Sequence, residues 1–179
     1  MDLKNKINEA IENDDYDQLL NSFEINKGDF FYIPSGTLHA ISSGSLIYEA
    51  QQSSDITYRV YDYHRKDKDG NERQLHVQQS IDVTNVPTDL ETNKLFTNSH
   101  LDHGSKTRYV ESEFFTVDCY RMDGENTVIN DKPFQLVSVL EGEGTLEGMD
   151  VKMGDHFIIC SDQKEVTYDG KMTVMITTL

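Results

Sequence analysis

A histidine that directly follows a rigid turn is the first residue of this sequence whose position suggests chemistry. His39 comes after Pro34-Ser35-Gly36, where proline fixes φ and glycine tolerates a tight bend. An imidazole held there can present a ring nitrogen to a metal with little conformational freedom left to lose. Neutral imidazole suits zinc, iron, nickel or manganese, so the residue alone does not choose the metal. A histidine hydrogen-bonded within the turn is the simpler alternative.

Polar side chains gather on one face of the segment that follows. If residues 46–61 are largely strand, Glu49, Asp55 and Arg59 fall on the same face, because side chains alternate with a period of two. Charged groups buried without partners are costly. The face is therefore either solvated or the lining of a polar cavity, and the pattern alone leaves both interpretations open.

Two motifs carry a family resemblance. Residues 33–40 (IPSGTLHA) and 49–62 (EAQQSSDITYRVYD) resemble the type I mannose-6-phosphate isomerases, particularly the short branch of Gram-positive bacteria. The similarity continues through residues 69–76 and 136–144 and covers essentially the whole chain. The resemblance implies a cupin fold and a zinc ion held in the first cupin by glutamine, histidine, glutamate and histidine.

The same resemblance implies roles for individual residues. His39 matches the last zinc ligand of the family, and Arg59 matches the active-site arginine, which acts on the charged intermediate or on the phosphorylated sugar. Glu49 and Asp55 match acidic positions of that pocket. Lys66 belongs to a charged loop that is expected to be solvated, and it is the second candidate for a contact with the substrate phosphate.

The resemblance implies an aldose–ketose isomerisation. Members of the family interconvert mannose 6-phosphate and fructose 6-phosphate through an enediol, by moving a proton between neighbouring carbons. Zinc would polarise the substrate oxygens. An arginine fork suits an anion, because it stays charged and donates several hydrogen bonds in one plane.

The sequence departs from the family where the other zinc ligands are expected. No histidine precedes His39, and Gln18 is the only glutamine before it. Zinc sites usually need three protein ligands. We therefore expect a truncated or split member, or a domain, that is inactive alone and is completed by a separate N-terminal fragment. A non-catalytic cupin that binds sugar phosphates or serves as an interaction module is the alternative, and DNA just upstream that encodes the missing ligands would favour the isomerase.

Short elements are expected to position these residues. Leu3, Ile7 and Ala10 repeat at helical spacing, and residues 2–22 predict two short helices separated at 13–15. Strands are expected at 30–33, 46–50, 57–61 and 75–77. An exposed hairpin loop is expected over 66–72 and a short helix over 78–83.

A second block rich in strand signals begins near residue 108. Strands are expected at 114–120, 134–140, 151–159 and 174–176, with a sharp bend at 141–146. The Gly-Asp turns at 28–29 and 154–155 each open an apolar strand, which suggests two related barrel units. Short strands with frequent glycine turns favour a sandwich or barrel.

The fold expected is mainly β, a double cupin-like sandwich or barrel of jelly-roll type with a short helical N-terminal segment. Its parts are a helical remnant of the inserted helical region (1–23), a partial first cupin with the active-site face (24–88), a connection (89–107) and a second, metal-free cupin-like domain (108–179). The remaining histidines are expected in loops, in strands or at the surface: His64, His76, His100, His103 and His156.

Composition limits the class of protein. A net charge of −16 and a pI near 4.6 argue against nucleic-acid binding, and any anionic substrate must be caught by a local arginine or lysine. No apolar run reaches the roughly 18 residues of a membrane span. Cys119 and Cys160 are expected to be buried free thiols, in agreement with a reducing cytoplasm. Apolar surface left exposed by the missing part is expected to favour a homo-oligomer.

Overall fold

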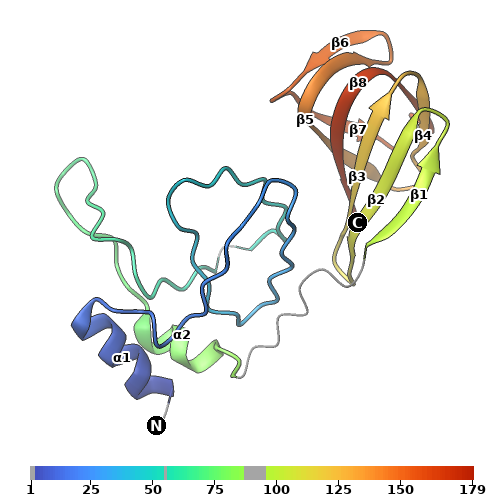
Figure 1. The fold of residues 1–179 in the computed structure, drawn as a ribbon. Coiled ribbons are helices and arrows are strands. Elements are labelled where there is room, and N and C mark those ends of the chain that lie inside the picture. Colours follow the sequence, from blue (N-terminus) through green and yellow to red (C-terminus); the bar gives the residue numbers. More distant parts are fainter. Residues whose placement is uncertain (1–2, 55, 87–95) are drawn as a thin grey trace. The chain divides into compact units, whose positions relative to one another are not determined.

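The computed structural model describes residues 3–54, 56–86 and 96–179, and its elements are two short helices followed by an antiparallel sheet (Figure 1). The elements are α1 (Leu3–Asn13), α2 (Val77–Val83), β1 (Thr97–Leu101), β2 (Gly104–Glu111), β3 (Thr116–Asp123), β4 (Asn126–Ile129), β5 (Phe134–Leu146), β6 (Met149–Lys152), β7 (His156–Cys160) and β8 (Glu165–Thr178).

The chain divides into two compact units. We call residues 1–48 with 53–91 the N-terminal unit, and residues 49–52 with 92–179 the C-terminal unit. Both helices lie in the N-terminal unit and every named strand lies in the C-terminal unit.

Helix α1 forms as the apolar spacing predicts. Ile7 and Ala10 lie on one face and are buried, and α1 contacts α2. The helix ends where the polar run was expected to end it, because Asp14 adopts a left-handed backbone with φ of 52°. The second short helix expected before residue 22 is wrong: residues 16–20 make a single turn, in which the Leu20 N–H donates to the Tyr16 carbonyl over 2.9 Å. So short a segment gains too few hydrogen bonds to offset helix nucleation.

Helix α2 and the preceding hairpin confirm two further predictions. Lys66 and Glu72 form an antiparallel bridge at the base of the expected loop. Inside the loop, one oxygen of Asp67 accepts from the Asp69 and Asn71 N–H groups over 2.8 and 2.9 Å. These backbone hydrogen bonds lower the pKa of the Asp67 carboxyl, and the bond from the Asn71 N–H has the largest effect. The loop is thus ordered by one acidic side chain.

The strands that the sequence predicted for residues 24–88 are not found in the described part of that range. In the described part of that range, segments 30–33, 46–50 and 57–61 carry no strand, and residue 77 of segment 75–77 begins α2. A strand needs a neighbour that satisfies its backbone groups. Between segments 57–61 and 75–77 the His76 N–H donates to the Arg59 carbonyl over 2.7 Å, but this contact does not extend into a ladder. β-type side chains alone therefore did not suffice to make strands in this unit.

The C-terminal unit is built around its last strand. β8 pairs with β3, β4 and β5, and the strand order β1-β2-β3-β8-β5-β6 is antiparallel throughout (Figure 1). Alternate residues of β8 face the core, and Val166, Tyr168 and Val174 are completely buried. The mainly β class predicted from the sequence is confirmed, whereas the residue ranges of the four proposed parts remain predictions.

Residues 141–146, which were expected to bend the chain, instead continue β5. The pairing of β5 with β8 shifts register between Val139 and Glu141, which is a β-bulge. Gly142 follows with φ of 76°, and a Cβ there would lie 2.0 Å from the Lys171 carbonyl oxygen. Glycine is required here because both the backbone angle and the close strand exclude a side chain.

The two Gly-Asp turns are alike in atomic detail. In the first, the Asn26 N–H donates to Asp29 Oδ2 over 2.7 Å and the Asp29 N–H donates to the Asn26 carbonyl over 3.1 Å. In the second, Lys152 and Asp155 make the same pair of bonds over 2.8 and 3.0 Å. The second turn leads into β7, whereas the first leads into an extended segment without a strand partner.

The two thiols are unpaired, as predicted, but differ in exposure. Cys119 is buried and Cys160 is exposed, so the prediction that both are buried is wrong for Cys160. In β7 the inward position next to it is taken by Ile159, and alternation turns Cys160 outward. Burial raises the pKa of the Cys119 thiol.

Candidate functional site

The turn that precedes His39 is held from two sides. The Thr37 N–H donates to the Pro34 carbonyl over 3.2 Å, and Gly36 has φ of 83°. Asn85, just after α2, donates its backbone N–H to the Gly36 carbonyl over 2.8 Å and its side-chain amide to the Ser35 carbonyl over 3.2 Å. A side chain at position 36 would overlap Asn85. The bend that carries His39 is therefore fixed by a residue far along the chain.

The His39 ring is exposed and keeps one nitrogen toward solvent. Its Nδ1 lies 2.9 Å from the Thr37 carbonyl oxygen. A carbonyl can only accept, so this contact assigns the proton to Nδ1 and leaves the lone pair on Nε2 in the neutral ring. Metal-binding histidines commonly donate their second N–H to a backbone carbonyl in this way. Both interpretations made from the sequence, a turn hydrogen bond and a metal ligand, are compatible with this ring.

The donor set around His39 does not make a zinc site by itself. Among the residues described, no group of three or more histidine, cysteine, aspartate or glutamate side chains is arranged to hold a metal ion. His64, His100, His103 and His156 are exposed, and His76 is half-buried. In the part of the chain that the structure describes, His39 is thus not part of a group of three donors, the number that zinc sites usually need.

Arg59 is held by the chain segment that leads into α2. Its backbone N–H donates to His76 Nδ1 over 3.3 Å, and its Nη1 donates to the Gln74 carbonyl over 3.3 Å. Its Nε lies 3.8 Å from Oδ1 of Asp62, and 23% of its side chain is exposed. His39 and Arg59 have different partners, and whether they face a common substrate stays a prediction. The Arg59 side chain is thus partly buried and anchored by a backbone carbonyl.

Asp62 is a functional candidate that sequence reasoning missed. It is 8% exposed, and Arg73 binds both of its oxygens, with Nε donating to Oδ2 over 2.6 Å and Nη2 donating to Oδ1. The hydrogen bonds from Arg73 hold the pKa of the Asp62 carboxyl below its usual range, and the charges of Arg73, Arg59 and Arg65 act in the same direction. Its signal in the sequence was an aspartate three residues after the arginine of the second motif.

The other site residues predicted from the sequence are Glu49, Asp55 and Lys66. Glu49 is exposed and belongs to the C-terminal unit, whereas His39 and Arg59 belong to the N-terminal unit. Asp55 lies outside the described residues. Lys66 is exposed at the base of the hairpin, opposite Glu72. The structure therefore brings Arg59 together with Asp62, while the roles of Glu49 and Asp55 stay predictions.

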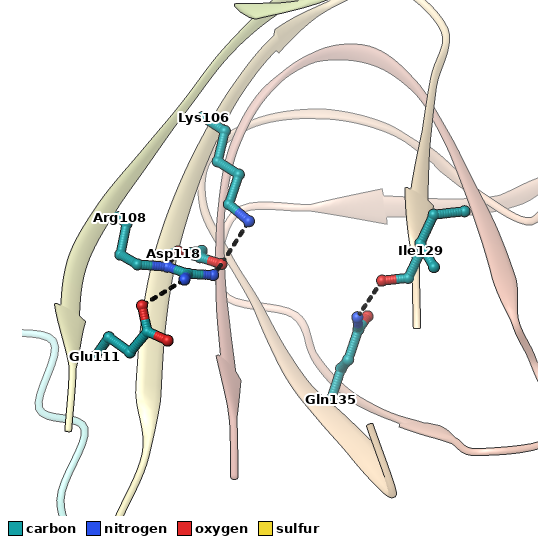
Figure 2. Close-up of polar contacts among 6 residues, drawn as sticks. All are labelled: Lys106, Arg108, Glu111, Asp118, Ile129 and Gln135. Carbon is teal, nitrogen blue, oxygen red and sulfur yellow. Dashed lines mark hydrogen bonds and ion pairs between the residues drawn. The ribbon is translucent and has the colours of Figure 1, made fainter. Parts of the chain in front are cut away.

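A second charged cluster lies on β2 and β3 of the C-terminal unit. Asp118, 7% exposed, accepts from Lys106 Nζ over 2.7 Å and from Arg108 Nε and Nη2 over 2.9 and 3.2 Å (Figure 2). Glu111 accepts from Arg108 Nη1 over 2.7 Å. The hydrogen bonds to Asp118 and Glu111 raise the pKa of Arg108, and those to Asp118 have the largest effect. The two positive and two negative side chains neutralise one another.

Three described side-chain atoms of the C-terminal unit are buried without a hydrogen-bond partner: Gln135 Oε1, Tyr168 Oη and Thr177 Oγ1. Gln135 on β5 donates its amide to the Ile129 carbonyl over 3.1 Å, as Figure 2 shows, while its Oε1 is buried without a partner. Such an atom costs stability and is usually satisfied by water. Because the charges of the cluster balance, we assign the cluster a structural role in the C-terminal unit.

Comparison with known proteins links both units to one family. The family model described as the cupin domain of mannose-6-phosphate isomerase matches residues 105–179. A mannose-6-phosphate isomerase of Streptococcus mutans is 40% identical over 176 residues, covering 96% of this chain and 55% of the relative. One from Bacillus subtilis is 37% identical over 180 residues, covering 98% and 57%.

A solved structure agrees with these matches. The crystal structure of the mannose 6-phosphate isomerase from Bacillus subtilis superposes with a TM-score of 0.90 at 34% identity, covering 98% of this chain and 57% of that one. The chain spans a little over half the length of the relatives that it matches. In the described residues, neither helix has the length and apolar character required to cross a bilayer.

Proposed function

Because this chain belongs to the mannose-6-phosphate isomerase family, we propose that it takes part in interconverting mannose 6-phosphate and fructose 6-phosphate. The observation that carries this proposal is Arg59, a partly buried and fixed cation in the motif that marks the family. In a chain of net charge −16, such a local cation is what an anionic sugar needs. The proposed setting is the cytoplasm.

In this proposal Arg59 binds the phosphate or the negative charge that develops on the sugar oxygens. A guanidinium does both well, since it stays charged and its hydrogen bonds lie in one plane. Glu49 and Asp55 are proposed as the acidic groups from which a proton transfer between neighbouring carbons would draw its base. Lys66 is proposed as a further contact with the phosphate. Each role concerns a side chain of this chain.

Zinc dependence is part of the proposal, with His39 as one ligand through Nε2. Because the described residues contain no group of three donors, we propose that zinc and turnover both require ligands from a further polypeptide segment. The chain alone is then expected to bind the sugar phosphate without isomerising it. A separate N-terminal fragment is the proposed partner that supplies the missing ligands.

The test combines calorimetry with metal analysis of the purified chain. Mannose 6-phosphate should bind, neutral mannose should bind at least about 10-fold more weakly, and Arg59→Ala should abolish the difference between them. Zinc should be present at well under one equivalent, and no fructose 6-phosphate should form. Stoichiometric, chelator-sensitive zinc with turnover lost in His39→Ala would contradict the single-donor proposal.

The alternative function is a non-catalytic module that binds sugar phosphates or another partner. The observation that favours it is the lack of a group of three or more metal donors among the described residues. Adding zinc and a segment carrying the missing ligands decides between the two. Restored turnover supports the isomerase, whereas binding of mannose 6-phosphate that stays catalytically silent supports the module.

A further inference from the structure

Asp62 occupies a turn that the chain adopts against its conformational preference. The Arg65 N–H donates to the Asp62 carbonyl over 3.0 Å, and the two residues between them, Tyr63 and His64, have φ of 55° and 50°. Bulky residues seldom adopt this left-handed region, and they do so where surrounding contacts hold them. Here the Arg65 guanidinium lies over the Tyr63 ring at 5.2 Å. Backbone outliers of this kind often mark functional positions.

The carboxylate of Asp62 lies between two guanidinium groups. Arg73 binds both of its oxygens, which fixes the plane of the carboxylate, and Arg59 approaches the same Oδ1 with Nε at 3.8 Å. Arg73 therefore offsets the charge of Asp62. Because one carboxylate faces two cations, the group as a whole stays positive, and Asp62 can orient Arg59 without cancelling its attraction for an anion.

The remaining contacts of Arg59 leave one edge of its guanidinium for a ligand. Nε faces Asp62 and Nη1 donates to the Gln74 carbonyl, while the backbone is paired with His76 on both its N–H and carbonyl sides. Within the part of the chain that the structure describes, Nη2 has no such bond. An arginine whose Nη1 is hydrogen-bonded and whose Nε is ion-paired with Asp62 presents Nη2 in a defined direction.

We propose that Asp62, locked by Arg73, is a positioning residue that orients Arg59 for its anionic ligand. This inference rests on the proposed function, in which Arg59 is the group that contacts the sugar phosphate. Asp62 acts through the arginine and touches no substrate. Holding the guanidinium in place before binding removes the ordering cost that a free arginine would meet on binding.

A double-mutant cycle with mannose 6-phosphate as the probe tests this role. By calorimetry, Asp62→Asn should weaken binding about 5-fold in the wild-type background and less than about 2-fold in the Arg59→Lys background, because coupled neighbours are not additive. Asp62→Glu, which keeps the charge, should recover part of the loss. An equal loss in both backgrounds would show that Asp62 is merely structural and would overturn the proposal.

A ligand-free measurement separates this inference from the proposed function. The side-chain Nε–H resonance of Arg59, assigned by its absence in Arg59→Lys, should exchange with solvent about 5-fold faster in Asp62→Asn. An unchanged exchange rate overturns the positioning role whether or not the sugar binds. Faster exchange in a protein that does not bind mannose 6-phosphate supports the positioning role and contradicts the proposed function.

Asp118 provides a matched control. Like Asp62 it is a buried aspartate that binds one arginine through both oxygens and a second cation through one of them, but it lies in the C-terminal unit. Asp118→Asn should leave both the affinity for mannose 6-phosphate and the Arg59 exchange rate within about 2-fold of wild type. A loss as large as that of Asp62→Asn would mean that the effect is a general response to destabilisation.

Discussion

At the scale of single residues, two buried aspartates, Asp62 and Asp118, each contact two positively charged side chains. Asp118 accepts hydrogen bonds from Lys106 and Arg108, whose side chains are 25% and 33% exposed. Asp118→Asn removes the charge that both cations share, and we expect it to lower the free energy of unfolding by about 1–3 kcal/mol. The chain has no tryptophan, so denaturant unfolding is followed by far-UV circular dichroism. Glu111→Gln, at a carboxylate that is 66% exposed, should change it by less than about 0.5 kcal/mol.

Asp62 predicts a pH dependence of stability. Since Arg73 holds the pKa of Asp62 below its usual range, the folded protein binds this proton more weakly than the unfolded chain does. The stabilisation is complete above the unfolded value of about 3.9 and is lost as pH falls through the lower folded value. Wild type should therefore lose thermal stability more steeply than Asp62→Asn below about pH 4. Parallel pH profiles of the two proteins would contradict this assignment.

At the scale of elements, the bulge in β5 shows how one residue type is required by two separate constraints. Gly142 and Gly148 have nearly the same φ, 76° and 77°, but only at Gly142 would a Cβ meet the neighbouring strand. Gly148→Ala should cost about 1–2 kcal/mol from the backbone alone. Gly142→Ala should cost more, because β8 must also move away from the Lys171 carbonyl. Equal losses in denaturant unfolding would show that the clash relaxes freely.

The elements also show which parts of the fold could be predicted from sequence. α1, α2 and the hairpin over 66–72 follow from local spacing and turn chemistry, because their hydrogen-bond partners lie close in the chain. The predicted strands that became β3, β5, β7 and β8 were found from their apolar and β-branched side chains, although β8 pairs with residues far along the chain. The strands expected at 30–33 and 57–61 failed, because β-branched and aromatic composition cannot supply a neighbouring strand. His39 and Arg59 were found through motifs. Asp62 was missed because its proposed role depends on its hydrogen bonds with Arg73, eleven residues away, and no spacing rule links the two residues.

At the scale of the whole molecule, net charge opposes association while exposed apolar side chains favour it. Leu46 is 93% exposed, and Ile158, on a strand that pairs only with β5 in the described sheet, is 67% exposed. Edge strands with apolar side chains invite pairing between chains. The charge of −16 repels a second copy, and salt screens that repulsion over a Debye length of about 10 Å at 0.1 M.

Self-association should therefore rise with ionic strength. Sedimentation velocity should show a monomer at low salt and a growing fraction of larger species as sodium chloride is added. Ile158→Lys, which replaces an exposed apolar side chain of β7 with a charge, should shift the distribution back toward the monomer. Thr127→Lys, at an exposed polar position of β4 in the same sheet, should do so much less. Both variants add the same charge, so a difference between them isolates the contribution of the apolar Ile158 side chain. Dissociation on adding salt would instead assign the contact to ion pairs.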